Sequence, residues 1–228
     1  MSGLARANTG TVIGVEAHPV TVEAHRAKGL PGLTLIGLAR GAVRESAVRV
    51  RSAILASGVS LGTQRSVVNL LPAELPKEAS ALDLPLAVAL LAASGLLEPD
   101  ALEGRRFFGE LSLGGRLEAV RGGVLLADLV RRQGERELIV PSQNAAEASV
   151  IPGVRVIGAD TLGEVIAHLD GTMPIAAAEY QPLGIRREHP CLSDVRGQAR
   201  AKRALEIAAA GSPFPSMGIN PNANLAHQ

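Results

Sequence analysis

The densest group of reactive side chains in this 228-residue sequence lies in one segment, LPAELPKEASALD, residues 71–83. Ser80 and Lys77 are the residue types of a serine–lysine pair, in which an amine activates a hydroxyl nucleophile. Glu78 and Asp83 could supply a general acid and a general base. The same side chains are also typical of caps and turns beside a buried helix, and no histidine lies nearby to act as a base. We favour the structural interpretation and keep only Ser80 and Lys77 as catalytic candidates.

Two apolar segments enclose this loop. Val67–Leu71 is rich in strand-forming residues, and Leu84–Ser94 is apolar on every side, as in a buried helix. Pro85 suits the first helical turn, where its missing N–H is harmless, and Asp83 takes the N-cap position. The sequence therefore predicts a strand, a polar loop and a buried helix.

The remaining segments alternate between strand and helix patterns, which predicts an α/β fold. The helix expected over residues 39–57 has an apolar stripe at i, i+4, i+7 and i+11, formed by Val43, Ala47, Val50 and Ile54. Further strands are predicted at Thr11–Ala17, Val20–Ala24, Leu33–Ile36, Glu137–Val140 and Val154–Ile157, and as a hairpin of Phe107–Leu113 with Arg116–Val120 through Gly114-Gly115. Further helices are predicted at Val124–Arg132, around Ala145, at Leu162–Leu169 and at Gln198–Ala210.

The composition limits the possible functions. Apolar residues make up 46% of the chain, enough for a core, but the sequence has no tryptophan, one tyrosine and three phenylalanines. So few aromatic residues weaken any proposal of base stacking on single-stranded nucleic acid. A net charge of +1 gives no global attraction to DNA or membranes, so any basic surface must be local. One cysteine and no signal-like segment predict a cytoplasmic protein without disulfides.

The local basic group that stands out lies on the helix predicted for residues 39–57. Arg40, Arg44 and Arg51 fall together at the edge of its apolar stripe. These three and Arg49 could contact phosphates, although a solvated helix face has the same composition. The five histidines show no ligand spacing, so no metal site is expected. The phosphate-cradling pattern G-x-x-x-x-G-K-[ST] does not occur in the sequence.

Five segments, in this order, closely resemble the bacterial magnesium-chelatase-like AAA+ ATPases of the ComM/YifB type. They are TVIGVEAHPVTVEAHRAKGLPGLTLIGL, AVRESAVRVRSAILASG, VNLLPAELPKEASALDLPLAVALLAASG, FFGELSLGGRLEAVRGGVLLA and LIVPSQNAAEA. The resemblance covers about residues 11–211. It implies an N-terminal domain with the two-layer Lon-protease-like fold, also seen in a ribosomal protein, with a mixed sheet and helices. It also implies an ATPase module that forms a hexameric ring around DNA and drives branch migration during recombination, as in competence and natural transformation.

The resemblance divides the chain into four parts: a Lon-like domain over residues 1–170, a linker over 171–193, the start of an AAA+ module as an isolated helix over 194–211, and an unrelated, disordered tail over 212–228. Val195, Gly197 and Gln198 match the module's opening and would lie near the adenine of a nucleotide. Because the Walker motifs, arginine finger and lid do not follow, we expect a truncated product that is not an enzyme. ATP and magnesium are expected only in full-length relatives.

The Lon resemblance also bears on the loop. Aligned this way, the nucleophile position holds Ala81, with Ser80 one residue out of register, and the lysine position falls near Val124 in a helix without lysine. Proteolysis is therefore disfavoured. The leading interpretation is a DNA-engaging or assembly domain of a recombination ATPase, with a cryptic serine–lysine hydrolase and a pure interaction domain as alternatives. Expected partners are branched or single-stranded DNA, other copies of this chain or full-length AAA+ relatives, and no membrane.

Overall fold

The computed structural model describes residues 3–27, 29–30, 32–37, 40–62, 64–77, 80–180, 192 and 195–210, with the side chains of residues 40–44 and 80 left undescribed. The chain forms two compact units, Met1–Gln181 and Pro182–Gln228. The boundary between the units thus falls eleven residues beyond position 170, the end predicted for the first domain. The predicted tail over residues 212–228 lies outside the described residues.

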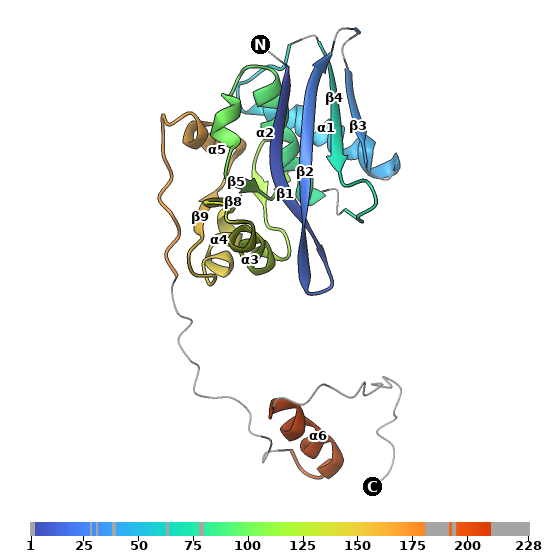
Figure 1. Ribbon diagram of the computed structural model, residues 1–228, viewed down its shortest axis with the longest axis vertical. Helices are drawn as coiled ribbons and strands as arrows, with labels where there is room; N and C mark the ends of the chain where they lie inside the picture. The colour runs from blue at the N-terminus through green and yellow to red at the C-terminus, as the bar shows by residue number, and fades with distance from the viewer. Residues whose placement is uncertain are drawn as a thin grey trace. The chain divides into compact units, whose positions relative to one another are not determined.

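The first unit is built on a mixed seven-stranded sheet in the order β3-β4-β2-β1-β5-β8-β9 (Figure 1). Strand β2 runs antiparallel to both of its neighbours, and the other neighbouring pairs are parallel. The strands are β1 (Leu4–Ile13), β2 (Glu16–Ala27), β3 (Gly32–Ile36), β4 (Arg65–Leu71), β5 (Arg105–Phe107), β8 (Glu137–Pro141) and β9 (Arg155–Ala159). The α/β class and the mixed sheet predicted from the sequence are confirmed.

The first hairpin differs from its prediction. The turn falls at Gly14-Val15, where Gly14 has a φ of +62°, so the strand predicted over Thr11–Ala17 spans both sides of that turn. The break predicted between Ala17 and Val20 does not occur, because Pro19 lies inside β2 opposite Gly10. Strand β4 pairs with β2 only from Thr21 onward, so the missing N–H of Pro19 removes no bond to a second neighbour.

Helices cover both faces of the sheet, though unequally. Helices α1 (Arg40–Ala56), α2 (Asp83–Ala93) and α5 (Leu162–Leu169) pack on one face, and α3 (Gly123–Gln133) and α4 (Ser142–Ala148) pack on the other. Short 3₁₀ turns, Ser80–Leu82 and Pro99–Leu102, flank α2. Every residue of α2 is buried, which confirms the predicted core helix.

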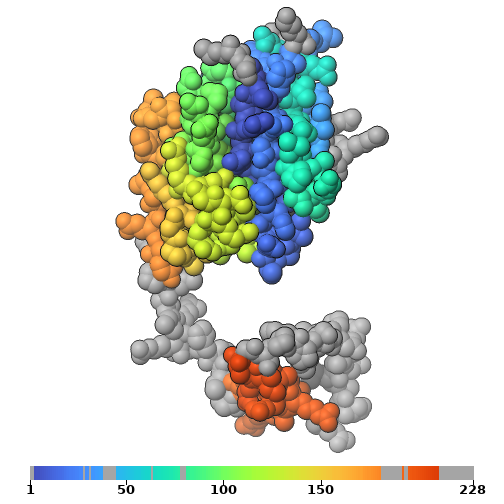
Figure 2. Space-filling view, in the orientation of Figure 1, coloured from blue at the N-terminus to red at the C-terminus, as the bar shows by residue number. Residues whose placement is uncertain are grey.

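The second face of strands β1, β2, β4 and β3 is largely uncovered. Close packing of α3 against β1 is restricted to the hairpin end, near Gly10 and Val12. Beyond it the strands lie at the surface, as Figure 2 shows for β1, β2 and β4 (dark blue, blue and teal). This open sheet face includes the exposed side chains Ile36 and Leu71 and the partly buried Val67.

Two smaller features complete the unit. The predicted hairpin forms only as β6 (Glu110–Leu111) and β7 (Leu117–Glu118), because Phe107 instead ends β5 in the main sheet. Residues 171–178, which the sequence places in the linker, follow α5 and run back past β9; we call them the strap. Ala178 N–H donates to the Val156 carbonyl at 2.8 Å. The second unit contains one described helix, α6 (Ala199–Ala209).

Candidate functional site

Hydrogen bonds within the reactive loop, and one from β1, hold this loop in place. The Lys77 Nζ donates to the carbonyl oxygens of Pro72 and Leu75, and the Thr11 hydroxyl donates to the Pro76 carbonyl at 2.8 Å. Partial burial lowers the pKa of the Lys77 amine. The amine is nevertheless engaged as a donor within its own loop, which is a structural role.

The nucleophile position of the Lon alignment is occupied by the buried Ala81, whose carbonyl accepts from Gly109 N–H at 3.1 Å. The side chain of Ser80 lies outside the described residues, as does the whole of Glu78. Val124 lies in the first turn of α3, a helix without lysine. The serine–lysine pair therefore stays a sequence-based hypothesis.

Asp83 was predicted to be the N-cap of the buried helix, and this is wrong. The N-cap is Leu82, which makes no side-chain capping bond, and Asp83 is the first residue of α2. Its fully buried carboxylate accepts from Arg49 Nε at 2.7 Å, from Arg49 Nη2 at 3.3 Å and from the Leu111 amide at 3.3 Å. The Asp83 side chain points into the protein because the Arg49 guanidinium of α1 donates two charge-assisted hydrogen bonds to it. Asp83 thus joins α2 to α1 and β6.

The ionisation of this pair reflects its burial. Burial raises the pKa of the Asp83 carboxyl, and the hydrogen bonds from Arg49 oppose that rise. The hydrogen bond to Asp83 raises the pKa of the Arg49 guanidinium, which keeps it charged. Arg49 also donates to the Ser46 hydroxyl at 3.3 Å. Arg49 points into the protein and is not available as a phosphate ligand.

The other three arginines predicted to contact phosphates occupy positions on one side of α1. At 100° per residue, Arg40, Arg44 and Arg51 fall within an arc of about 40°. Arg51 is exposed and lines a small recess with Gly62 and Leu33, while the side chains of the other two arginines are not described. The exposed Val48 and Leu55 belong to the same side of the helix.

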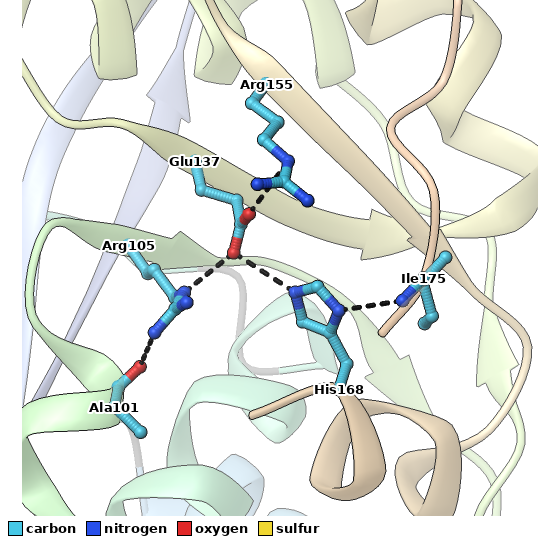
Figure 3. Close-up of polar contacts among 6 residues, drawn as sticks. All are labelled: Ala101, Arg105, Glu137, Arg155, His168 and Ile175. Atoms are coloured by element: carbon cyan, nitrogen blue, oxygen red, sulfur yellow. Dashed lines mark hydrogen bonds and ion pairs between the residues drawn. The ribbon is translucent and has the colours of Figure 1, made fainter. Parts of the chain in front are cut away.

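A second polar cluster, which the sequence did not indicate, is centred on the buried Glu137 of β8 (Figure 3). Glu137 Oε1 accepts from Arg105 Nε of β5 at 2.7 Å and lies 3.2 Å from His168 Nε2 of α5, and Oε2 lies 3.3 Å from Arg155 Nε of β9. We call these four residues the Glu137 hub. They are separated by up to 63 positions in the sequence, so no local pattern marks them.

The contacts within the hub affect the pKa of Glu137 and fix the hydrogen-bonding roles of the His168 ring nitrogens. Burial alone would raise the pKa of Glu137, but hydrogen bonds from Arg105 and His168 outweigh it and lower that pKa below its ordinary value. The Ile175 amide donates to His168 Nδ1 at 3.0 Å, so Nδ1 carries no proton. The other ring nitrogen, Nε2, lies 3.2 Å from Glu137 Oε1 and is the one that can donate to that carboxylate.

Within the described ranges, no three His, Cys, Asp or Glu side chains form a group that could hold a metal ion. None of the helices in those ranges has the length and apolar character needed to cross a bilayer. The described part of the second unit holds the three predicted adenine-site residues in one turn ahead of α6. Gly197 and Gln198 both have left-handed backbone conformations, and Val195 is exposed.

Comparison with known proteins places these features in a family. A model described as subunit ChlI of Mg-chelatase matches residues 22–144, more than half of the chain. The chain belongs to this family. Residues 22–144 contain α1, β4, the reactive loop, α2 and α3. The family match therefore covers Asp83 and the arginines of α1.

Curated relatives refine the position within the ChlI family. The chain is 43% identical, over 91% of its length, to the uncharacterized protein YifB of Salmonella typhimurium, and 43% identical over 90% to YifB of Escherichia coli. It is 41% identical over 87% to the competence protein ComM of Haemophilus influenzae. This ChlI-family chain is thus of the ComM/YifB type. It spans 40–41% of the length of those three relatives.

Proposed function

We propose that the larger unit of this ChlI-family chain is a DNA-engaging domain with the Lon-protease-like fold. In this proposal α1 contacts phosphates through Arg40, Arg44 and Arg51. The name of the Haemophilus influenzae relative refers to competence, and we extend that role here to recombination of incoming DNA in the cytoplasm. The observation that carries the proposal is the spacing of the three arginines along one helix, which puts their positions within about 40° of one another around its axis.

The geometry of α1 suits a nucleic-acid backbone. Arg40 and Arg51 are eleven residues apart, about 16 Å along the helix axis, which matches the rise of about five nucleotides. The fourth arginine of this helix region, Arg49, is held by Asp83 and anchors the helix to the core. A rigidly anchored helix that presents three cations can follow a backbone without reading bases.

The test is a fluorescence-anisotropy titration of a branched and a single-stranded DNA at two or more salt concentrations. Replacing Arg40, Arg44 and Arg51 together with alanine should weaken binding and reduce the slope of log K against log salt by about 2 to 3, because three phosphate contacts release that many counterions. The matched control replaces three exposed arginines outside α1, Arg121, Arg131 and Arg132, and should leave most of the slope unchanged.

Equal loss in the two triple variants would refute a site on α1. Absence of binding in the unsubstituted protein would refute the proposal and favour the interaction-domain alternative. The open sheet face supports that alternative, since exposed Ile36 and Leu71 on uncovered strands are typical of a protein-contact surface. Sedimentation of the same sample would then reveal self-association, the form of assembly that the interaction alternative requires.

A further inference from the structure

We propose that the strap, residues 171–178, is a detachable segment that His168 latches to the first unit, and that its release lengthens the connection to the second unit. The strap follows α5 directly and precedes the unit boundary at Gln181. The proposal concerns the connection alone and stands whether or not α1 binds DNA.

Three backbone amides attach the strap. Met173 N–H donates to the Ala167 carbonyl at 2.9 Å, Ile175 N–H donates to His168 Nδ1 at 3.0 Å, and Ala178 N–H donates to the Val156 carbonyl at 2.8 Å. The first bond continues the end of α5, and the last covers the outer edge of β9. Of these three bonds, the middle one depends on a side chain outside the strap. At the start of the strap, Thr172 also donates its amide to Asp170 Oδ1 at 2.8 Å and its hydroxyl to the Ala167 carbonyl at 3.3 Å.

Ile175 and Ala178 are the strap residues that pack against the apolar cores, and both are only partly buried. None of residues 171–180 is buried, and Met173 is 71% exposed. A cavity of about 410 Å³ between α5 and the strap is lined by Gly163, Ala167, Met173, Pro174 and Ile175, with Glu164 at its side. A segment with few buried apolar contacts and incomplete packing is one that opens locally without global unfolding.

The latch, by contrast, rests on a rigid base. His168 is buried, and its Nε2 faces Glu137, which two arginines from β5 and β9 also hold (Figure 3). The hub therefore sets the ring orientation that presents Nδ1 to the strap. The His168 imidazole thus connects the other residues of the Glu137 hub to the weakly packed strap.

Release of the strap changes the reach of the chain. Eight residues that leave the surface add at most about 28 Å to the connection, at about 3.5 Å per extended residue. With the strap attached, the connection leaves the first unit near Ala178, beside β9. Once released, it leaves from the end of α5.

Two variants separate the latch from the hub. In His168→Gln the side-chain amide can still donate to Glu137 but offers no acceptor at the Nδ1 position. In His168→Asn the Oδ1 atom stands where Nδ1 was, which keeps an acceptor for Ile175 N–H and loses the bond to Glu137. Hydrogen exchange of the full chain, followed by mass spectrometry or NMR, reports on both.

For His168→Gln we expect the amides of Ile175 and Ala178 to exchange at least about tenfold faster, while β8 keeps its protection. In His168→Asn they should stay within about threefold of the unsubstituted protein. Unchanged strap exchange in His168→Gln would overturn the latch. An equal rise in β8 would also overturn it, because His168 would then support the whole fold.

The predicted lengthening of the connection between the two units can be measured separately. Spin labels on the single Cys191 and on a cysteine replacing the exposed Gln133 of α3 span the strap. The distance distribution should broaden toward longer values in His168→Gln and stay unchanged in His168→Asn. Identical distributions in all three proteins would refute the lengthening.

Discussion

The role of each polar residue in this protein depends on the partners that the fold gives it. Asp83 and Lys77 are six positions apart, yet Asp83 is a buried ion-pair partner of Arg49 in α1, and Lys77 bonds to carbonyls of its own loop. Both look like catalytic groups in the sequence. Their partners in the structure give each a positioning role within the fold.

Replacing Asp83 with alanine should lower the free energy of unfolding by roughly 3 kcal/mol, because the variant leaves Arg49 without its carboxylate. Arg49 is 22% exposed and can reach water, which limits the loss. Chemical denaturation measures it. A loss of only about 1 kcal/mol would match a simple capping residue and contradict the ion-pair role. In the Arg49→Ala, Asp83→Ala double variant, the loss should be smaller than the sum of the two single losses.

The Glu137 carboxyl predicts an acid sensitivity with a definite sign. Its pKa is lower in the folded chain than in the unfolded chain, where it is about 4.3, so folding favours the deprotonated form. That stabilisation is complete above about pH 4.3 and is lost as the pH falls through the lower folded value. Glu137→Gln should therefore flatten the fall in unfolding free energy as the pH drops from about 5 to about 3, whereas Glu98→Gln, at an exposed site, should not.

At the scale of elements, the contact of α3 with β1 depends on a missing side chain. A Cβ on Gly10 would lie 2.6 Å from Leu126 and 3.0 Å from Leu129 of α3. The helix can approach the strand this closely only because position 10 is glycine. This contact closes the hairpin end of the second sheet face and leaves the remainder open.

Gly10→Ala should therefore destabilise the protein by about 1–3 kcal/mol through overpacking. Gly163→Ala in α5 is the matched control, because the nearest atom to its added Cβ is the Thr161 Oγ1 at 3.8 Å, and it should change stability by less than about 1 kcal/mol. Thermal unfolding followed by circular dichroism compares the two. Equal effects would contradict the close packing of α3.

At the scale of the whole molecule, the units differ in how they are stabilised. The first unit has cores on both faces of its sheet, whereas none of the residues of α6 in the second unit is buried. The chain spans about two fifths of the length of its curated relatives. The strap is the point where the first unit passes into the connection.

The amino-acid sequence alone determined the α/β class, the buried helix α2, most helix positions and the family. Local periodicity and contiguous motifs carry this information, because a helix stripe or a family segment can be read within a few tens of residues. The sequence misplaced the first turn. A proline usually ends a strand, and only the structure shows that β4 does not pair with β2 at Pro19.

Only the tertiary structure decided which polar groups meet. Arg49 and Asp83 are 34 positions apart, and the Glu137 hub gathers residues from β5, β8, β9 and α5. The topology of the sheet brings these strands together, and burial then requires each charge to find a partner. In the folded chain Asp83, predicted to be a helix cap, forms an ion pair with Arg49. Residues 171–178, predicted to belong to a linker, lie along the first unit as the strap.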